Sequence, residues 1–265
     1  MEQKILLLSG KKQSGKNTAC NFIHGYVMRQ EGVTRHFNID DKGRLLVYTN
    51  YQQGNEIKEG MGILNLDDPS DDFYVYAANR IWPYVKAYSF ADPLKEMCMN
   101  LFGLTYAQCY GTDEDKNTPT KIQWKDFFFT MAPTSIVAVK ENKRENVNLT
   151  AREVLQQFGG LCRRINPDCW AEACLHRIQS EECPFAIITD ARFPNEMDLL
   201  KSVGAKSIRL ERSPFTDLHE SETALDNYED FDVILQNSEM SIQTQNDSVY
   251  SILLEWGWIG KQENS

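Results

Sequence analysis

The residues with the clearest chemical meaning lie near the N-terminus of the chain. Gly10, Gly15 and Lys16 have the spacing GxxxxGK, directly after a short apolar run. In such a loop, successive backbone N–H groups can point at one phosphate, glycines allow close approach, and the lysine reaches the phosphate oxygens. We therefore predict a loop that binds the phosphates of ATP. The predicted loop consists of Gly10, Lys11, Lys12, Gln13, Ser14, Gly15, Lys16, Asn17 and Thr18.

One position of this loop departs from the usual pattern. Asn17 follows Lys16, at the place where a serine or threonine hydroxyl commonly contacts Mg²⁺. Thr18 carries the next hydroxyl along the chain. We expect Thr18 to act on Mg²⁺ through water, or to contact the α-phosphate.

A second group of candidate residues follows a later apolar run. Residues 185–189 predict a buried strand that ends at Asp190, and Arg192 comes two residues later. A carboxylate at the carboxyl end of a parallel strand suits Mg²⁺, and a neighbouring arginine can bind phosphate oxygens through two nitrogens. We therefore predict that Lys16, Asp190 and Arg192 are catalytic and that Asp190 helps to hold the metal, through water. In the alternative interpretation, Asp190 only caps a helix that begins at Pro194.

The segments that would position these residues alternate between apolar runs and helical patterns. Strands are predicted at 4–9, 85–90, 185–189, 206–210 and 231–235. Helices are predicted at 16–29, from Asp92, at 150–158, at 167–178, from Pro194 and at 241–256. This alternation predicts an α/β fold with a mainly parallel sheet flanked by helices. Turn signals and short β-like runs between 34 and 83 predict a small β-rich insertion.

The overall composition narrows the functional class. The chain has 265 residues and a net charge of −10. A protein that mainly grips nucleic acid needs a basic face, so we expect no nucleic-acid partner. The seven cysteines include no CxxC pair, which favours reduced thiols over disulfides or a zinc site. No segment approaches the ~20 apolar residues of a membrane span, so we expect a cytoplasmic protein without a membrane partner.

Five segments together resemble the phage-type deoxynucleoside monophosphate kinases. They are SGKKQSGK at 9–16, SFADPLKE at 89–96, TAREVLQQFG at 150–159, TDARFPNE at 189–196 and HESETALDNY at 219–228. The resemblance runs to about Asn237 and skips the insertion at 34–83. Phosphomevalonate kinases of the animal type resemble the chain more distantly. Both families usually carry aspartate where this chain has Asn17.

The resemblance implies a P-loop NTPase fold of the nucleoside monophosphate kinase type, as a single domain 1–265. It implies transfer of the γ-phosphoryl group of ATP, with Mg²⁺, to a deoxynucleoside monophosphate in the cytoplasm, or in the host cytoplasm for a virus-encoded protein. The helical region 92–182 would bind the acceptor, and 211–228 would form a lid. The predicted acceptor-binding residues are Lys95, Arg152, Gln156, Trp170 and Arg192. The oligomeric state stays open, a homodimer included.

The same resemblance suggests finer roles for several side chains. Trp170 would either stack on the acceptor base or fill the core of a helical layer. Arg209 and Arg212 would close over the phosphates as part of the lid. Asn237 would lie beside the adenine of ATP.

Three functions are compatible with the sequence. The first is a deoxynucleoside monophosphate kinase, and the second is a kinase of another small phosphate, such as phosphomevalonate. The third is a P-loop protein that binds nucleotide without transferring phosphate, because Asn17 replaces the usual residue. Acceptor-dependent formation of ADP separates the first two functions from the third.

Overall fold

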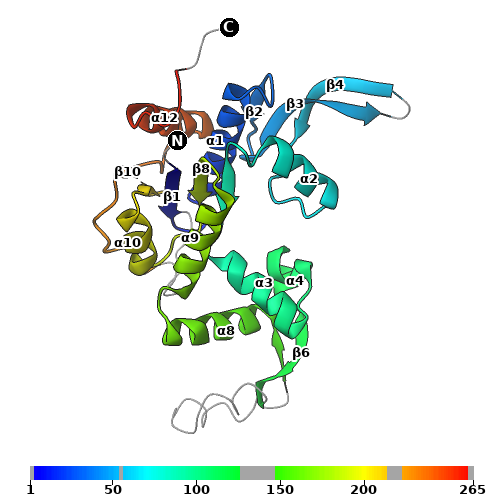
Figure 1. Ribbon diagram of the computed structural model, residues 1–265, viewed down its shortest axis with the longest axis vertical. Helices are drawn as coiled ribbons and strands as arrows, with labels where there is room; N and C mark the ends of the chain where they lie inside the picture. Colours follow the sequence, from blue (N-terminus) through cyan, green and yellow to red (C-terminus); the bar gives the residue numbers. More distant parts are fainter. Residues whose placement is uncertain (1–2, 54–55, 126–146, 214–222, 262–265) are drawn as a thin grey trace. The chain divides into compact units, whose positions relative to one another are not determined.

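The computed structural model (Figure 1) describes residues 3–53, 56–125, 147–213 and 223–261. These residues form two compact units. Unit 1 combines Met1–Ser89 with Cys174–Ser265, and unit 2 is Phe90–Ala173. Unit 2 lies almost entirely within the helical region that the sequence predicted at 92–182.

Unit 1 is built on a five-stranded sheet in which every pair of neighbouring strands is parallel. Its strands are β1 (Lys4–Gly10), β5 (Lys86–Tyr88), β8 (Phe185–Ile188), β9 (Lys206–Leu210) and β10 (Val233–Leu235), in the order β10-β9-β1-β8-β5. The leucines of the central strand β1, at 6–8, are fully buried, as expected where helices cover both faces of a parallel sheet. The predicted α/β fold with a mainly parallel sheet is therefore confirmed.

Three helices of unit 1 lie close to their predicted positions. They are α1 (Lys16–Gln30), α10 (Pro194–Ser202) and α12 (Ile242–Glu255). Ala19, Ile23 and Val27 recur every four residues along α1 and are buried, which places one apolar stripe of the helix in the core. Val249 and Leu253 of α12 belong to the same core cluster, so α1 and α12 pack side by side (Figure 1).

The segment at 34–83 contains a second, antiparallel sheet. Its strands are β2 (Phe37–Ile39), β3 (Leu45–Gln53) and β4 (Glu56–Ile63), which confirms the predicted β-rich insertion. The sheet lies against α1 at Gly25, where an added Cβ atom would come within 2.3 Å of Phe37 and 2.8 Å of Leu45. The segment also contains α2 (Asp71–Arg80), which the sequence analysis did not predict.

Unit 2 is mainly helical. It contains α3 (Ala91–Phe102), α4 (Tyr106–Tyr110), α5 (Asp113–Lys116), α8 (Ala151–Ile165) and the beginning of α9 (Cys169–Glu181), together with the paired strands β6 (Pro119–Gln123) and β7 (Asn148–Thr150). Thr150 and Glu153 form a capping box at the start of α8, since each side chain accepts a hydrogen bond from the other's backbone N–H. The core of unit 2 includes Cys98, Leu104, Cys109, Trp124, Leu149, Ala151 and Val154.

Two further features concern the chain as a whole. All seven cysteines are free thiols. Among the described residues, none of the helices combines the length and the apolar character needed to cross a membrane.

Candidate functional site

The predicted phosphate loop connects the central strand β1 to helix α1, as the motif requires. Gly10 adopts a φ of 145° and Gly15 a φ of 103°, which side-chain-bearing residues rarely adopt. A Cβ atom at Gly10 would also lie 2.6 Å from the backbone oxygen of Leu210 and 2.4 Å from Ser14 Oγ. The loop therefore requires glycine at position 10, because another residue would strain the backbone φ angle and its Cβ atom would clash with Leu210 and Ser14.

The start of helix α1 is open to an anion. Gly15 occupies the N-cap position, so no side chain of the cap accepts a hydrogen bond from the first backbone N–H groups. The first turn also contains no acidic residue. Unpaired N–H groups and the positive end of the helix dipole attract a phosphate at this end.

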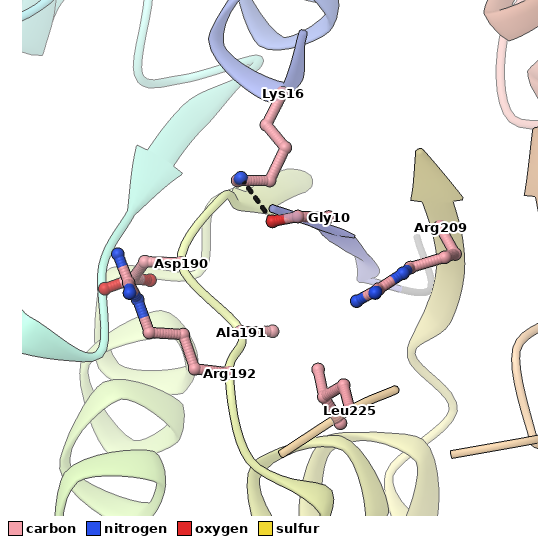
Figure 2. Close-up of a pocket in the computed structure, with 7 residues that line it drawn as sticks. All are labelled: Gly10, Lys16, Asp190, Ala191, Arg192, Arg209 and Leu225. Atoms are coloured by element: carbon pink, nitrogen blue, oxygen red, sulfur yellow. Dashed lines mark hydrogen bonds between the residues drawn. The ribbon is translucent and has the colours of Figure 1, made fainter. Parts of the chain in front are cut away.

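Lys16 curls back over the loop. Its Nζ donates hydrogen bonds to the backbone oxygen of Gly10, at 2.6 Å, and to that of Lys11, at 2.8 Å. Figure 2 shows the Lys16 side chain at a small cavity whose other lining residues come from β1, from the segment after β8, from β9 and from Leu225. This cavity, named the Lys16 cavity below, is lined by Gly10, Lys16, Asp190, Ala191, Arg192, Arg209 and Leu225.

Asp190 and Arg192 both reach the Lys16 cavity (Figure 2). Asp190 lies directly beyond the end of β8, and its Oδ2 accepts a hydrogen bond from Ser89 Oγ at 2.6 Å. Glu196 instead accepts hydrogen bonds from the backbone nitrogens of Arg192 (2.8 Å) and Phe193 (3.0 Å). Glu196, which is 3% exposed, is therefore a capping residue at the start of α10.

Arg209 is a further cation at this cavity, and it comes from strand β9 itself. It is only 7% exposed. Its guanidinium donates to Ser9 Oγ at 3.1 Å, to Glu211 Oε1 at 3.1 Å and to Asp226 Oδ1 at 3.3 Å. The sequence analysis placed Arg209 in a closing lid. The sequence did contain one indication that Arg209 belongs to the sheet: it is a charged residue inside the apolar run predicted as a strand at 206–210.

Asp226 links Arg209 to the phosphate loop. Its second carboxylate oxygen lies 3.2 Å from Lys11 Nζ, so one acidic side chain is shared by two cations. Leu225, next to it in the sequence, is buried and lines the Lys16 cavity. The lid predicted at 211–228 includes residues 214–222, which lie outside the described residues.

Buried side-chain amides form hydrogen bonds to the backbone of the predicted phosphate loop. Asn237 Nδ2 donates to the backbone oxygen of Ser14 at 2.7 Å and to Gln245 Oε1 at 2.6 Å, and Gln245 Nε2 donates to the oxygen of Gly15 at 3.2 Å. Arg212 donates from its backbone nitrogen to Asn237 Oδ1 at 2.8 Å and from its guanidinium to the backbone oxygens of Asn237 and Met240. The side chain of Asn237 is thus occupied within the protein, and its predicted contact with adenine stays a prediction.

Thr18 and Asn17 do not line the Lys16 cavity. Thr18 lies against the turn of the insertion, because a Cβ atom at Gly43 would come within 2.2 Å of Thr18 Oγ1. Asn17 is exposed and lines a different cavity of about 380 Å³, together with Thr189. The structure therefore brings Asp190 together with Lys16 and Arg192, and leaves Thr18 apart from them.

The other predicted acceptor residues lie in unit 2. Arg152 Nη2 donates to Asp113 Oδ1 at 2.6 Å, and Gln156 is exposed one turn later on α8. Lys95 Nζ lies 3.4 Å from Asp92 Oδ1 and 4.2 Å from the centre of the Tyr110 ring. Burial, with a smaller effect of Asp92, raises the pKa of Tyr110, so its phenol is neutral near pH 7.

Trp170 has a structural contact in unit 2. It is 6% exposed, and its indole nitrogen donates to the backbone oxygen of Gly159 at 3.2 Å. These observations agree with the core interpretation of this residue, and its stacking on a base stays a prediction. Within the described parts of the chain, no group of three or more His, Cys, Asp or Glu residues could hold a metal ion.

Comparisons with known proteins support the resemblance seen in the sequence. No protein-family model matches the chain. A protein of Acanthamoeba polyphaga mimivirus, named "Putative deoxynucleotide monophosphate kinase", is 29% identical over 158 residues, which cover 57% of this chain and 74% of that protein. An uncharacterized protein of Ictalurid herpesvirus 1 (strain Auburn) is 32% identical over 99 residues, which cover 34% of this chain and 43% of that protein. The first similarity confirms the resemblance to deoxynucleoside monophosphate kinases, and the parallel sheet agrees with a P-loop kinase-like fold.

Proposed function

We propose that this protein is a deoxynucleoside monophosphate kinase, which transfers the γ-phosphoryl group of ATP to a deoxynucleoside monophosphate and forms a deoxynucleoside diphosphate and ADP. The observation that carries the proposal is the phosphate loop, in which Lys16 and the open start of α1 lie beside Asp190 and Arg192. The named kinase of mimivirus supports the choice of acceptor. A phosphate loop alone supports only nucleotide binding.

The reaction needs no covalent intermediate with the protein. An oxygen of the acceptor phosphate attacks the γ-phosphorus, the new O–P bond forms, and the bond to the oxygen between the β- and γ-phosphates breaks as ADP leaves. Negative charge is spread over the γ-phosphoryl oxygens in the transition state. Lys16 and Arg192 neutralise this charge, and the N–H groups of the loop hold the neighbouring phosphates.

Asp190 fits the requirements of a magnesium site. Mg²⁺ in nucleotide-dependent enzymes is held by one or two carboxylates, substrate phosphates and water. Asp190 is one of the residues that line the Lys16 cavity, and its Oδ2 accepts a hydrogen bond from Ser89 Oγ at 2.6 Å. Asp190 would hold a bound Mg²⁺ on the protein side, and the ion would neutralise part of the phosphate charge. The hydrogen bond from Ser89 restricts the orientation of this carboxylate.

Unit 2 supplies the acceptor-binding residues in this proposal. The strongest indication is Arg152, whose Nε is buried and has no hydrogen-bond partner. A buried N–H group without a partner is rare in proteins and suggests that a ligand atom completes it. A phosphate oxygen is a suitable acceptor, because guanidinium and phosphate form paired hydrogen bonds.

The proposal is tested by measuring ADP formation from ATP and Mg²⁺ with one candidate acceptor at a time. The acceptors are dAMP, dCMP, dGMP, dTMP, GMP and phosphomevalonate. Turnover with at least one deoxynucleoside monophosphate, well above the rate without acceptor, is the expected result. Turnover with phosphomevalonate alone would establish the second function considered above. Nucleotide binding without any acceptor-dependent turnover would support the non-catalytic alternative.

A further inference from the structure

A second cavity lies on the side of unit 1 formed by α1, β2 and α12. Its volume is about 190 Å³. In Figure 1, α1 lies between α12 and β2, and both neighbours contact it. None of the residues that line this cavity lines the Lys16 cavity. We call it the α1–α12 cavity.

Aromatic rings form much of its wall. Phe22 and Tyr26 come from α1, Phe37 from β2 and Tyr250 from α12. The centres of the Phe22 and Phe37 rings are 5.9 Å apart at an interplanar angle of 56°, and those of Tyr26 and Tyr250 are 5.3 Å apart at 52°. Tilted rings around a small cavity provide flat apolar surfaces, which favour a planar ring as ligand.

Asn246 is a buried polar residue of this cavity, and its side-chain oxygen has no hydrogen-bond partner. It is 2% exposed, it lines the cavity, and its Oδ1 is buried without a hydrogen-bond partner. In the neighbouring amide of Gln245 both polar atoms have a partner, since its Oε1 accepts from Asn237 and its Nε2 donates to the backbone oxygen of Gly15. An unsatisfied buried amide is uncommon in a folded protein and calls for a partner.

The chemistry of this amide specifies the kind of ligand. A carboxamide offers an acceptor and a donor side by side, which matches the adjacent donor and acceptor on the edge of a nucleobase. Arg29 and Asp247 also line the cavity and carry opposite charges. Their charges balance, so the cavity favours a neutral ring over a polyphosphate. Its volume equals about six water molecules at ~30 Å³ each, enough for one small ring system.

From this arrangement we propose that the α1–α12 cavity binds a nucleobase, presented as a neutral nucleoside, at a site separate from the phosphate loop. Asn246 pairs with the donor and acceptor edge of the base, and the rings of Phe22, Phe37 and Tyr250 enclose its faces. The site lies where the β-rich insertion meets α1, which gives strand β2 a role in ligand binding. The proposal does not depend on the kinase activity.

The experiment uses 2-aminopurine riboside, a fluorescent adenosine analogue whose emission falls when its base stacks on aromatic rings. It is titrated with the full chain while a non-hydrolysable ATP analogue saturates the phosphate loop. Saturable quenching with one site per chain is the expected result. Lys16→Ala should bind the probe as the unaltered protein does, because Lys16 does not line this cavity.

Two variants test the cavity itself. Asn246→Leu removes the amide at similar size and should weaken probe binding about tenfold, while leaving the protein folded because the buried Oδ1 has no hydrogen bond to lose. Phe37→Ala removes one wall and should weaken binding by about tenfold or more. Glu255→Gln, at an exposed position of α12 that does not line the cavity, is the matched control and should leave binding unchanged. Thermal unfolding of each variant shows that it is folded.

Three results would overturn the proposal. The first is no quenching at millimolar probe. The second is displacement of the probe by the ATP analogue, or its loss in Lys16→Ala, which would place it in the phosphate loop. The third is unchanged binding by folded Asn246→Leu, which would place the probe elsewhere in the protein.

Discussion

At the scale of single residues, the phosphate-loop region contains several cationic side chains, and two of them pair with the same acidic residue, Asp226. Lys16 is held by backbone oxygens of its own loop, while Lys11 and Arg209 share Asp226. A bound phosphate would compete with the backbone oxygens of the loop for Lys16, and with Asp226 for Lys11 and Arg209. Arg209 contributes from a buried position in the sheet, so its charge is fixed before any ligand arrives. These residues therefore set how strongly the loop attracts a nucleotide.

Removing the shared acid should strengthen nucleotide binding. In Asp226→Asn, Lys11 and Arg209 lose a competing negative charge, and we expect ATP to bind a few-fold more tightly, with a steeper dependence on salt. Calorimetric titration at two salt concentrations measures both effects. Asp230→Asn is the control, because Asp230 is also an exposed acid but pairs with Lys201 instead. Weaker binding in Asp226→Asn would show that Asp226 positions its two cations.

Arg152 should act on the acceptor and not on ATP. In Arg152→Ala the KM for the deoxynucleoside monophosphate should rise at least tenfold, while the KM for ATP stays within about twofold, because a hydrogen bond to a charged group is worth ~1.5–3 kcal/mol. Steady-state kinetics with each substrate varied in turn measures this. Arg164→Ala, an exposed arginine of the same helix, should change neither value. Equal changes in both KM values would contradict the acceptor role.

His24 makes stability depend on pH. It is 2% exposed, and its Nδ1 lies 2.9 Å from the backbone oxygen of Cys20, to which it donates a hydrogen bond. Burial lowers its pKa from 6.5 to about 4, although the bond to Cys20 opposes this. Between pH 4 and pH 6.5, His24 is protonated in the unfolded chain but stays neutral in the folded protein. The stability contributed by neutral His24 is therefore complete above pH 6.5 and decreases as the pH falls towards 4.

This contribution can be isolated by substitution. The free energy of unfolding of the unaltered protein should fall by up to ~3 kcal/mol more than that of His24→Gln between pH 7 and pH 4, at about 1.4 kcal/mol per unit of pKa shift. Urea unfolding at a series of pH values measures the difference. His176→Gln, at an exposed position, should follow the unaltered protein. Parallel curves for His24→Gln and the unaltered protein would rule out a titrating His24.

At the scale of elements, the loop depends on the precise path of the chain between β1 and α1. Gly10→Ala places a methyl group 2.6 Å from a backbone oxygen of β9, which cannot move without disturbing the sheet. We expect it to destabilise the protein by ~1–3 kcal/mol and to abolish nucleotide binding. Gly32→Ala is matched, because Gly32 also has a positive φ, of 69°, but has open space around it.

The comparison needs two measurements on both variants. Urea unfolding should show a smaller loss of stability in Gly32→Ala, since only its backbone torsion is strained. Calorimetric titration with ADP should show unchanged binding in Gly32→Ala and none in Gly10→Ala. Normal ADP binding by Gly10→Ala would mean that the loop tolerates a side chain and does not follow the described path.

Elements with strong periodic patterns could be predicted from the sequence, and others could not. The apolar runs of β1, β8 and β9 and the stripe of α1 are local signals, because burial on both faces of a sheet or on one face of a helix determines them. Helix α2 carries Phe73, Tyr74, Val75 and Tyr76, which are typical of strands, and only its start, with the cap at Ser70 and two acidic residues in the first turn, indicates a helix. The residues from 111 to 125 form short elements, one of them with a capping box, that also depend on contacts within unit 2, which no periodic pattern reveals.

At the scale of the whole molecule, the candidate site is distributed over segments far apart in the sequence. Lys16, Asp190 and Arg192 could be proposed in advance, because the glycine-rich motif indicates the first and the end of one apolar strand indicates the other two. Arg209 and its partner Asp226 could not be placed beforehand, since their contacts depend on how β9, the loop and residues 223–228 meet in space. The same holds for Asn237 and Gln245, whose buried amides support the loop across more than 220 residues of sequence.

The most direct test of the central claim follows the phosphoryl group itself. The protein is incubated with Mg²⁺, ATP labelled on its γ-phosphate and each deoxynucleoside monophosphate, and the products are separated. We predict label in a deoxynucleoside diphosphate, and a rate at least a hundredfold lower in Lys16→Ala, because Lys16 stabilises transition-state charge. Label found only in inorganic phosphate or remaining in ATP, with a folded and nucleotide-bound protein, would contradict the assignment as a deoxynucleoside monophosphate kinase.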